Sequence, residues 1–482
     1  MEANNLKDEY KTKFKSIKTA NKSKKIALIV PYMGVSLILS FAFCLFYSLF
    51  IHRQFFNKSN YVEIISMFAV LAIMFVLLFV YEKYVTGQRG DKLKPHLISA
   101  VVSFVTLALS IFFIKTVSEF FVPLMFLFLA CAALVNTRSA MFNLFVNAFA
   151  LFFIILNSGI FNESTASYGV LFNTIAGTLT VFALKWNYKR INIIVLNILL
   201  GSVAAVLVYV YALLTNEFAE SEALWLLVSV VSSVFLFICL LPLFDRMFDV
   251  TTDFRIAEYL TLKNPVLKYL REKAPGTYNH SLIVATLAES CAEAIGENPL
   301  LARAAAYYHD VGKTKAPEFF SENQFDGYNP HDELIPEVSA SKIIAHTKNG
   351  VQMLKEKHFP EEIIKAAEEH HGTSPVNFFY NKAKNMTEGG RLSAGNYTYD
   401  NQKPSSKISA LIMICDTVES AVRANQSSDI PELIKKLVDD KIALGQFSEC
   451  DISLKDIDII ERTLLDTIPQ VFHSRVRYGS SK

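Results

Sequence analysis

Charged residues are scarce in this sequence of 482 residues: only 19% are Asp, Glu, Lys or Arg, and the net charge is +2. Without a strong positive balance, the chain gives no indication of a surface for a DNA or RNA polymer. Hydrophobic residues make up 52% of the sequence, which is too many for an ordinary soluble protein. We therefore expect a protein whose partner is a lipid bilayer.

Cysteine is also rare. The six cysteines include no Cys-x-x-Cys pair, and three lie in apolar runs while three lie in the more polar second half. This distribution argues against a disulfide framework and against a structural zinc site. Repeats and β-rich segments are lacking as well, so we predict an all-α fold.

Apolar segments of membrane-spanning length fill the first half of the chain. The run 26–50 is too long and too aromatic for a signal peptide, and we expect it to form an uncleaved transmembrane helix. Seven further segments predict a seven-helix block over 62–246, so the transmembrane bundle has one plus seven helices. Their approximate spans are 62–81, 97–116, 118–136, 140–160, 169–187, 191–214 and 224–246.

Basic residues in the connections indicate the orientation. Residues 1–25 contain eight lysines against three acids, and the connection 82–96 is also basic. The connections at 162–164 and 216–222, on the opposite side, contain no Lys or Arg. The positive-inside rule then predicts a basic cytoplasmic tail at 1–25, a short extracellular connection at 51–61, and a cytoplasmic C-terminal half. The apolar segments contain no relay of charged groups, which argues against a transporter.

Four asparagines lie inside the apolar segments: Asn143, Asn147, Asn173 and Asn197. They can line a ligand-sensing cavity, or they can form hydrogen bonds between helices. We favour the second interpretation, because it is the common role of amide side chains in a membrane.

The sequence of the second half predicts a linker or stalk helix over 247–273 and an all-helical domain over 274–482. Helices are expected at about 278–295, 299–309, 336–347, 348–358, 360–371, 405–424, 430–444 and 454–472, with a long loop at 381–404.

Histidine and aspartate recur on these predicted helices. The adjacent His309 and Asp310 can ligate one metal ion, and the carboxylate can bridge to a second. Asp416 follows an apolar run, where an unpaired carboxylate is costly to bury. A lone buried histidine is more often a core residue than a ligand, which applies to His280 and His346 when each is taken singly. The full candidate ligand set is His280, His309, Asp310, His346, His370, His371 and Asp416.

Nitrogen and oxygen ligands without a thiolate favour Mn or Fe over structural zinc, and helix bundles build dinuclear sites from such residues. We therefore expect two divalent metal ions. Lys313 follows Gly312 beside this site, and we expect it to contact a phosphate rather than to lie on the surface.

These motifs resemble the HD-domain metal-dependent phosphohydrolases. His280, His309-Asp310 and Asp416 match the H…HD…D pattern of that family, and His309-Asp310-Val311-Gly312-Lys313 resembles its HD-[IV]-G-K variant. With the membrane block in front, the chain is similar to the seven-transmembrane-receptor HD family.

The resemblance implies a bacterial cell-membrane enzyme of second-messenger signalling that hydrolyses cyclic di-AMP to pApA. It implies that a hydroxide between two metal ions attacks phosphorus, that Asp310 orients this nucleophile, and that Lys313 neutralises phosphate charge. One ion would be held by His280, His309, Asp310 and Asp416, and the other by His346, His370 and His371, with Asp310 bridging.

Two features depart from related families. A connection of only 51–61 stands where members of this family usually carry a large extracellular domain. The residues after His371 lack the acidic, Gly-Tyr-Pro-containing continuation of the branch that cleaves cyclic di-GMP, which argues against cyclic di-GMP as the substrate.

Two other functions stay open. The domain can hydrolyse another nucleotide, such as cyclic di-GMP, a linear dinucleotide or ppGpp, or it can be a non-catalytic nucleotide receptor. The intact ligand set favours an enzyme. A homodimer through the transmembrane helices and the stalk is a further hypothesis.

Overall fold

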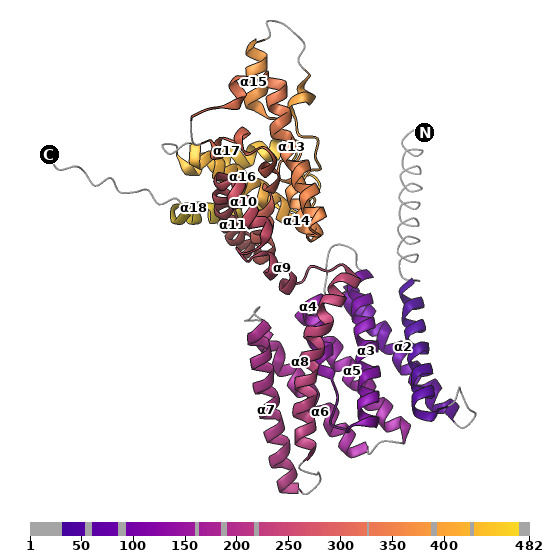
Figure 1. The fold of residues 1–482 in the computed structure, drawn as a ribbon. Helices are drawn as coiled ribbons and strands as arrows, with labels where there is room; N and C mark the ends of the chain where they lie inside the picture. The colour runs from indigo at the N-terminus through magenta and orange to yellow at the C-terminus, as the bar shows by residue number, and fades with distance from the viewer. Residues whose placement is uncertain are drawn as a thin grey trace, which may run out of the picture. The chain divides into compact units, whose positions relative to one another are not determined.

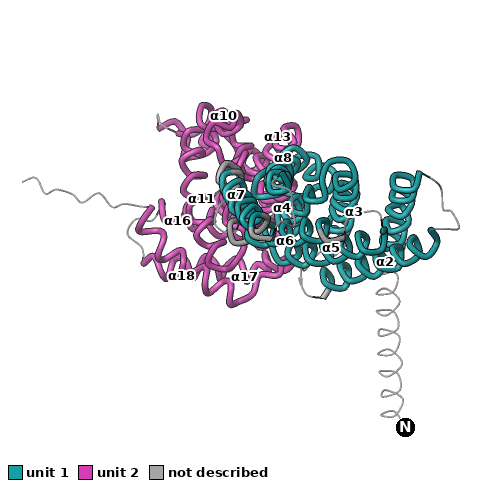
Figure 2. Tube along the Cα trace, turned by 90° about the horizontal axis from the view of Figure 1, so that it is seen from below, with its two compact units in different colours: residues 1–254 teal, residues 255–482 magenta. Residues whose placement is uncertain are grey.

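The computed structural model describes residues 31–53, 60–84, 93–159, 163–184, 190–215, 221–324, 327–386, 393–424 and 429–471. The chain divides into two compact units, Met1–Phe254 and Arg255–Lys482 (Figure 2). Within the described ranges the elements are helices, and the one β feature is an isolated antiparallel bridge between Pro375 and Thr398. The predicted all-α class is therefore confirmed. The basic tail at 1–25 lies outside the described residues.

The first unit is a bundle of apolar helices (Figure 1). A helix runs from residue 31 and ends in the π-helix η1 (Ser48–His52). It is followed by α2 (Tyr61–Tyr84), α3 (Leu93–Thr116), α4 (Leu124–Leu134), α5 (Thr137–Ser158), α6 (Glu163–Leu184), α7 (Arg190–Thr215) and α8 (Ser221–Phe248). Each of the eight predicted segments thus contains a helix. Five stretches of the described chain are long and apolar enough to cross a membrane: Pro31–His52, Tyr61–Lys83, Lys94–Thr116, Thr137–Ser158 and Ser221–Phe248.

The prediction of a spanning helix over 118–136 is wrong in extent. Helix α4 begins only after Pro123 and has 11 residues, which gives about 17 Å of length. The hydrocarbon core of a bilayer is about 30 Å thick. Because α4 packs against α3, α5, α6 and α8, nearly all of its side chains are buried inside the bundle. The number of crossings therefore stays a prediction.

The asparagines of the first unit form hydrogen bonds between helices. Asn143 and Asn147 of α5 donate to serine hydroxyls on α3 at 3.3 and 2.9 Å. Asn173 of α6 accepts a hydrogen bond from a serine of α8, and Asn197 of α7 accepts one from a threonine of α6. The interhelical role that we favoured from the sequence is confirmed.

The second unit is built around a long central helix, α11 (Pro275–Ile295), which packs against α12, α16 and α18. Its other α-helices are α9 (Asp253–Tyr259), which begins at the division between the units, α10 (Pro265–Lys273), α12 (Pro299–Tyr308), α13 (Pro336–Glu356), α14 (Glu361–Glu369), α15 (Asn377–Met386), α16 (Lys407–Ala424), α17 (Ile430–Ala443) and α18 (Leu454–Val471). Short 3-10 helices include η3 (Val311–Lys315), η5 (Ser321–Asn323) and η6 (Pro330–Asp332). The buried alanines of α12 allow α11 to approach closely.

Two predictions for the second unit need correction. The two helices expected at 336–347 and 348–358 are the single helix α13. The helix continues through the expected boundary, and η3 packs against its backbone at Gly350. The segment 381–404, which we expected to be a loop, contains helical residues, since α15 extends to Met386 and a 3-10 helix spans Ala394–Tyr397.

Gly312 permits the close approach of η3 to α13. A Cβ atom at this position would lie 1.9 Å from the carbonyl oxygen of His346 and 2.5 Å from the backbone nitrogen of Gly350. No side chain fits between these backbones. The glycine therefore brings the His309-Asp310 pair, which directly precedes η3, beside the helix that carries His346.

Gly312→Ala is expected to destabilise the second unit by about 1–3 kcal/mol, because the new methyl group must push two backbones apart. Limited proteolysis of the full chain in detergent, at rising temperature, would show cleavage of this unit at a lower temperature. Gly395→Ala is the matched control, since its nearest contact, Ser393 Oγ at 3.7 Å, is an ordinary one. Equal behaviour of the two variants would contradict the packing argument.

Candidate metal centre

The structure brings all seven predicted ligands together inside the second unit. They come from five places along the chain: α11, the end of α12, α13, the turn after α14, and α16. They form two groups, within each of which one candidate ligand atom per residue lies within 4.8 Å of the others. The first group is His280, His309, Asp310 and Asp416, and the second is His346, His370 and His371. All are buried except His371, which is partly exposed.

Asp310 lies between the two groups and faces both. Its Oδ2 atom is 3.3 Å from Nε2 of His309 and 3.6 Å from Nε2 of His280. Its Oδ1 atom is 3.3 Å from Nε2 of His346 and 3.6 Å from Nε2 of His370. One carboxylate thus presents a different oxygen to each group, which is the arrangement a bridging ligand requires.

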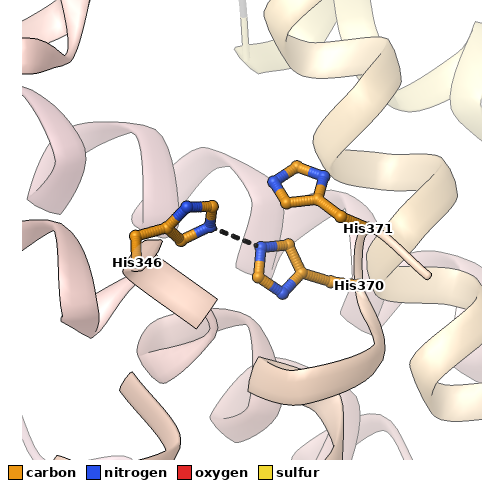
Figure 3. A group of neighbouring side chains, drawn as sticks. All are labelled: His346, His370 and His371. Atoms are coloured by element: carbon orange, nitrogen blue, oxygen red, sulfur yellow. Dashed lines mark hydrogen bonds between the residues drawn. The ribbon is translucent and has the colours of Figure 1, made fainter. Parts of the chain in front are cut away.

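The three histidines of the second group converge (Figure 3). The Nε2 atoms of His346 and His370 are 3.2 Å apart. The ring centroids of His370 and His371 are 4.2 Å apart, although the two residues are adjacent in sequence. Gly372 follows them with a φ of +51°, a left-handed conformation that a glycine adopts without strain.

Helix geometry fixes which nitrogen of each ring is available. In His309, His346 and His370 the Nδ1 atom donates to the backbone carbonyl three residues earlier, at 2.8, 2.6 and 3.0 Å. Because Nδ1 carries a hydrogen in such a bond, Nε2 is the ring nitrogen left to bind a metal ion, and it points to the centre. These are the outer contacts that metal-binding histidines typically make.

Glu419, which we did not predict from the sequence, orients the remaining buried histidine. Its Oε2 atom lies 2.5 Å from Nδ1 of His280, and its side chain is completely buried. It stands three residues after Asp416 on α16, so both carboxylates lie on one face of that helix. The signal in the sequence that could have identified Glu419 was this three-residue spacing from Asp416 within an apolar run.

Several buried polar atoms at the centre have no hydrogen bond within the described part of the chain. They are Nε2 of His280, Nε2 of His309 and Oδ1 of Asp310. Leaving such atoms unsatisfied is costly. Their convergence, with only nitrogen and oxygen donors present, fits divalent metal ions such as Mn or Fe.

The histidines of the two groups differ in the direction of their pKa shifts. Burial alone would lower the pKa of His280 and His309, but the surrounding carboxylates outweigh it, and the pKa of His309 is raised to about 10. In the second group burial dominates and lowers the pKa of His370 to about 4, and that of His371 far below its usual value. A metal ion entering the first group must therefore displace protons, so its affinity falls as pH falls.

Lys313 is largely buried beside Asp310. Its Nζ atom is 2.7 Å from Asp310 Oδ2 and 3.0 Å from Oε1 of Glu322, a second acid that the sequence did not reveal. Burial raises the pKa of Asp310, but the Lys313 ammonium together with His309 and His346 outweighs this effect and holds the pKa well below its usual value. The lysine is thus part of the centre rather than of the surface.

Other histidines lie apart from these groups. His331 is buried, but its Nε2 atom is 2.9 Å from the carbonyl of Phe319, and neither it nor His358 joins a ligand group in the described chain. The ring of Tyr399 stacks on His371, with centroids 4.4 Å apart and an interplanar angle of 27°, and forms one side of the centre.

Comparisons with known proteins point to the same part of the chain. The family model of the HD domain matches residues 277–462. The chain is 34% identical over 431 residues to "Cyclic-di-AMP phosphodiesterase PgpH" of Listeria monocytogenes serotype 1/2a (strain 10403S), covering 86% of this chain and 59% of that protein. It is also 34% identical over 443 residues to the protein of the same name from Bacillus subtilis (strain 168), covering 88% and 61%.

The chain spans about 60% of the length of these curated relatives. A crystal structure described as the L. monocytogenes phosphodiesterase PgpH HD domain in complex with cyclic-di-AMP matches with 45% identity and a TM-score of 0.42. The match covers 44% of this chain and 100% of that one. Residues 277–462 thus match the HD domain, and the chain is similar over most of its own length to the two PgpH proteins.

Proposed function

We propose that this protein is a membrane-anchored phosphodiesterase that hydrolyses cyclic di-AMP to pApA at the metal centre of its HD domain. The observation that carries the proposal is Asp310, whose two carboxylate oxygens face two separate groups of ligands. A carboxylate in this position is suited to hold a pair of metal ions at a fixed spacing. The names of both curated relatives support cyclic di-AMP as the substrate.

The donor set supports two divalent ions, Mn or Fe. His280, His309, Asp310 and Asp416 would hold one ion. The other would be held by His346, His370 and His371, with Asp310 shared. When bound, such a pair activates water and stabilises the negative charge of a phosphoryl transition state.

The protein's own residues would supply position and charge. The Nδ1 hydrogen bonds of the buried histidines keep their Nε2 atoms aimed at the centre before any ion arrives. Asp310 would orient the attacking water, because its oxygens face both groups. The Lys313 ammonium, held by two carboxylates next to this position, would neutralise charge on the scissile phosphate.

The membrane part of the proposal rests on the five long apolar helices and on the basic segments of the sequence. We place the protein in the cell membrane as a multi-pass protein with its N-terminus and HD domain in the cytoplasm, where cyclic dinucleotides occur. Cysteine accessibility to a membrane-impermeant reagent would test this orientation. A homodimer through the transmembrane helices and residues 247–273 belongs to the same proposal.

The direct test is incubation of the purified full chain, in detergent with Mn²⁺ or Fe²⁺, with cyclic di-AMP, cyclic di-GMP and ppGpp in parallel. Conversion of cyclic di-AMP to pApA is expected. Preferential turnover of another nucleotide would show that this nucleotide is the substrate. Tight binding of a nucleotide without turnover would show that the protein is a receptor.

Asp310→Ala is expected to lower kcat by at least roughly 10³-fold, because the variant loses the shared ligand and with it several kcal/mol of transition-state stabilisation. Metal content, measured by mass spectrometry of the purified protein, should fall in parallel. Asp458→Ala, which removes an exposed carboxylate of α18, is the control. Full activity of Asp310→Ala with an unchanged metal content would contradict the two-metal proposal.

Glu419→Gln is expected to weaken metal binding by about 10–100-fold, because a neutral amide supports the Nδ1 hydrogen of His280 less well than a carboxylate does. Competition with a chelator of known affinity measures this change directly. Glu432→Gln, an exposed position in the first turn of α17, should leave the affinity unchanged. Identical chelator curves for Glu419→Gln and the unaltered protein would show that Glu419 does not support the metal ligand.

A further inference from the structure

A second lysine lies close to the metal centre, on an element that contributes no metal ligand. Lys441 is in the last turn of α17, and its Nζ atom donates to the hydroxyl of Ser374 at 3.0 Å. Ser374 follows His371 by three residues, and its backbone nitrogen donates to the His371 carbonyl at 3.0 Å. The ammonium group therefore stands beside the turn that begins with two candidate ligands.

This turn is held rigidly. The side-chain amide of Gln446, itself buried, accepts from the backbone nitrogen of Thr373 and donates to its hydroxyl, both at 3.1 Å. On the other side, the backbone nitrogen of Tyr399 donates to the Ser374 carbonyl at 3.1 Å. Because the turn is fixed at both sides, Ser374 and Lys441 present a preorganised hydroxyl and ammonium.

The two lysines of the centre differ in their partners. Lys313 contacts two carboxylates, whereas Lys441 forms no ion pair with any carboxylate in the described part of the chain. Burial lowers the pKa of Lys441, and the charges of Asp416 and Asp440 offset this only in part. A partly buried ammonium whose hydrogen-bond partner is a hydroxyl has unused capacity to bind an anion.

We propose that Lys441 and Ser374 bind the second phosphate of a cyclic dinucleotide, the one that is not cleaved, while Lys313 serves the scissile phosphate. This inference rests on the proposed function, since a cyclic dinucleotide carries two phosphodiesters with one negative charge each. Lys441 is a binding residue in this scheme. It takes no part in the bond that breaks, so its contribution is to affinity rather than to the chemical step.

The test compares a substrate that has two phosphates with one that has a single phosphate. Lys441→Gln in the full chain is expected to raise KM for cyclic di-AMP at least about tenfold, the value of one charge-assisted hydrogen bond, with kcat nearly unchanged. Hydrolysis of bis(p-nitrophenyl) phosphate, which has one phosphodiester, should not change. Lys441→Arg keeps the charge and should recover most of the affinity.

Lys436→Gln is the matched control, because Lys436 is an exposed lysine of the same helix. An unchanged KM for cyclic di-AMP in Lys441→Gln would overturn the inference. An equal loss on both substrates would also overturn it, since the lysine would then support the metal centre itself. If the unaltered protein cleaves bis(p-nitrophenyl) phosphate but no cyclic dinucleotide, the proposed function fails, and this inference fails with it before any variant is compared.

Discussion

The carboxylate of Asp310 is the contact on which the second unit depends. A single side chain, completely buried, faces four histidines and one lysine that arrive from different helices. A buried carboxylate without such partners would be strongly unfavourable. The surrounding helices are consequently arranged to bring nitrogen donors to it, and the close contact of Gly312 with α13 is one means by which this is achieved.

The centre is asymmetric in charge, although Asp310 is shared. The first group contains two carboxylates and gains a third at its edge in Glu419, so its histidines favour the protonated form. The second group consists of three imidazoles, and burial together with repulsion from neighbouring histidines lowers the pKa of His370 and of His371. The two positions therefore offer different net charge to the ions that they would hold, and the first favours the cation more strongly.

The candidate ligands, which the structure brings together, could be picked out from the sequence because their residue types are rare and their neighbours are distinctive. His309-Asp310, His370-His371 and the apolar run before Asp416 each carry a local signal. Glu419 and Glu322 carry none beyond helical spacing, since glutamate is common on exposed helix faces, and only tertiary contacts show that these two are buried. Lys441 could not be predicted for the same reason, because it acts together with Ser374, which lies in a turn far away in the sequence.

The fold, too, could be predicted from the sequence only in part. Long apolar runs predicted helices in the correct places, but hydropathy does not reveal that α4 begins only after Pro123 and lies within the bundle. Likewise, the sequence predicted a boundary between residues 347 and 348, whereas α13 continues to Glu356 and η3 packs against its Gly350. In both cases the missing information was the packing partner.

His309 and His370 each lie at the C-terminal end of a helix. The Nδ1 atom of each donates a hydrogen bond to a backbone carbonyl of the final turn. A metal ion on Nε2 would therefore pull on the last turns of α12 and α14 through the same two rings. Order at these helix ends and occupancy of the centre would then be a single equilibrium. The final turns of α12 and α14 would then be better ordered when the centre is occupied than when it is empty.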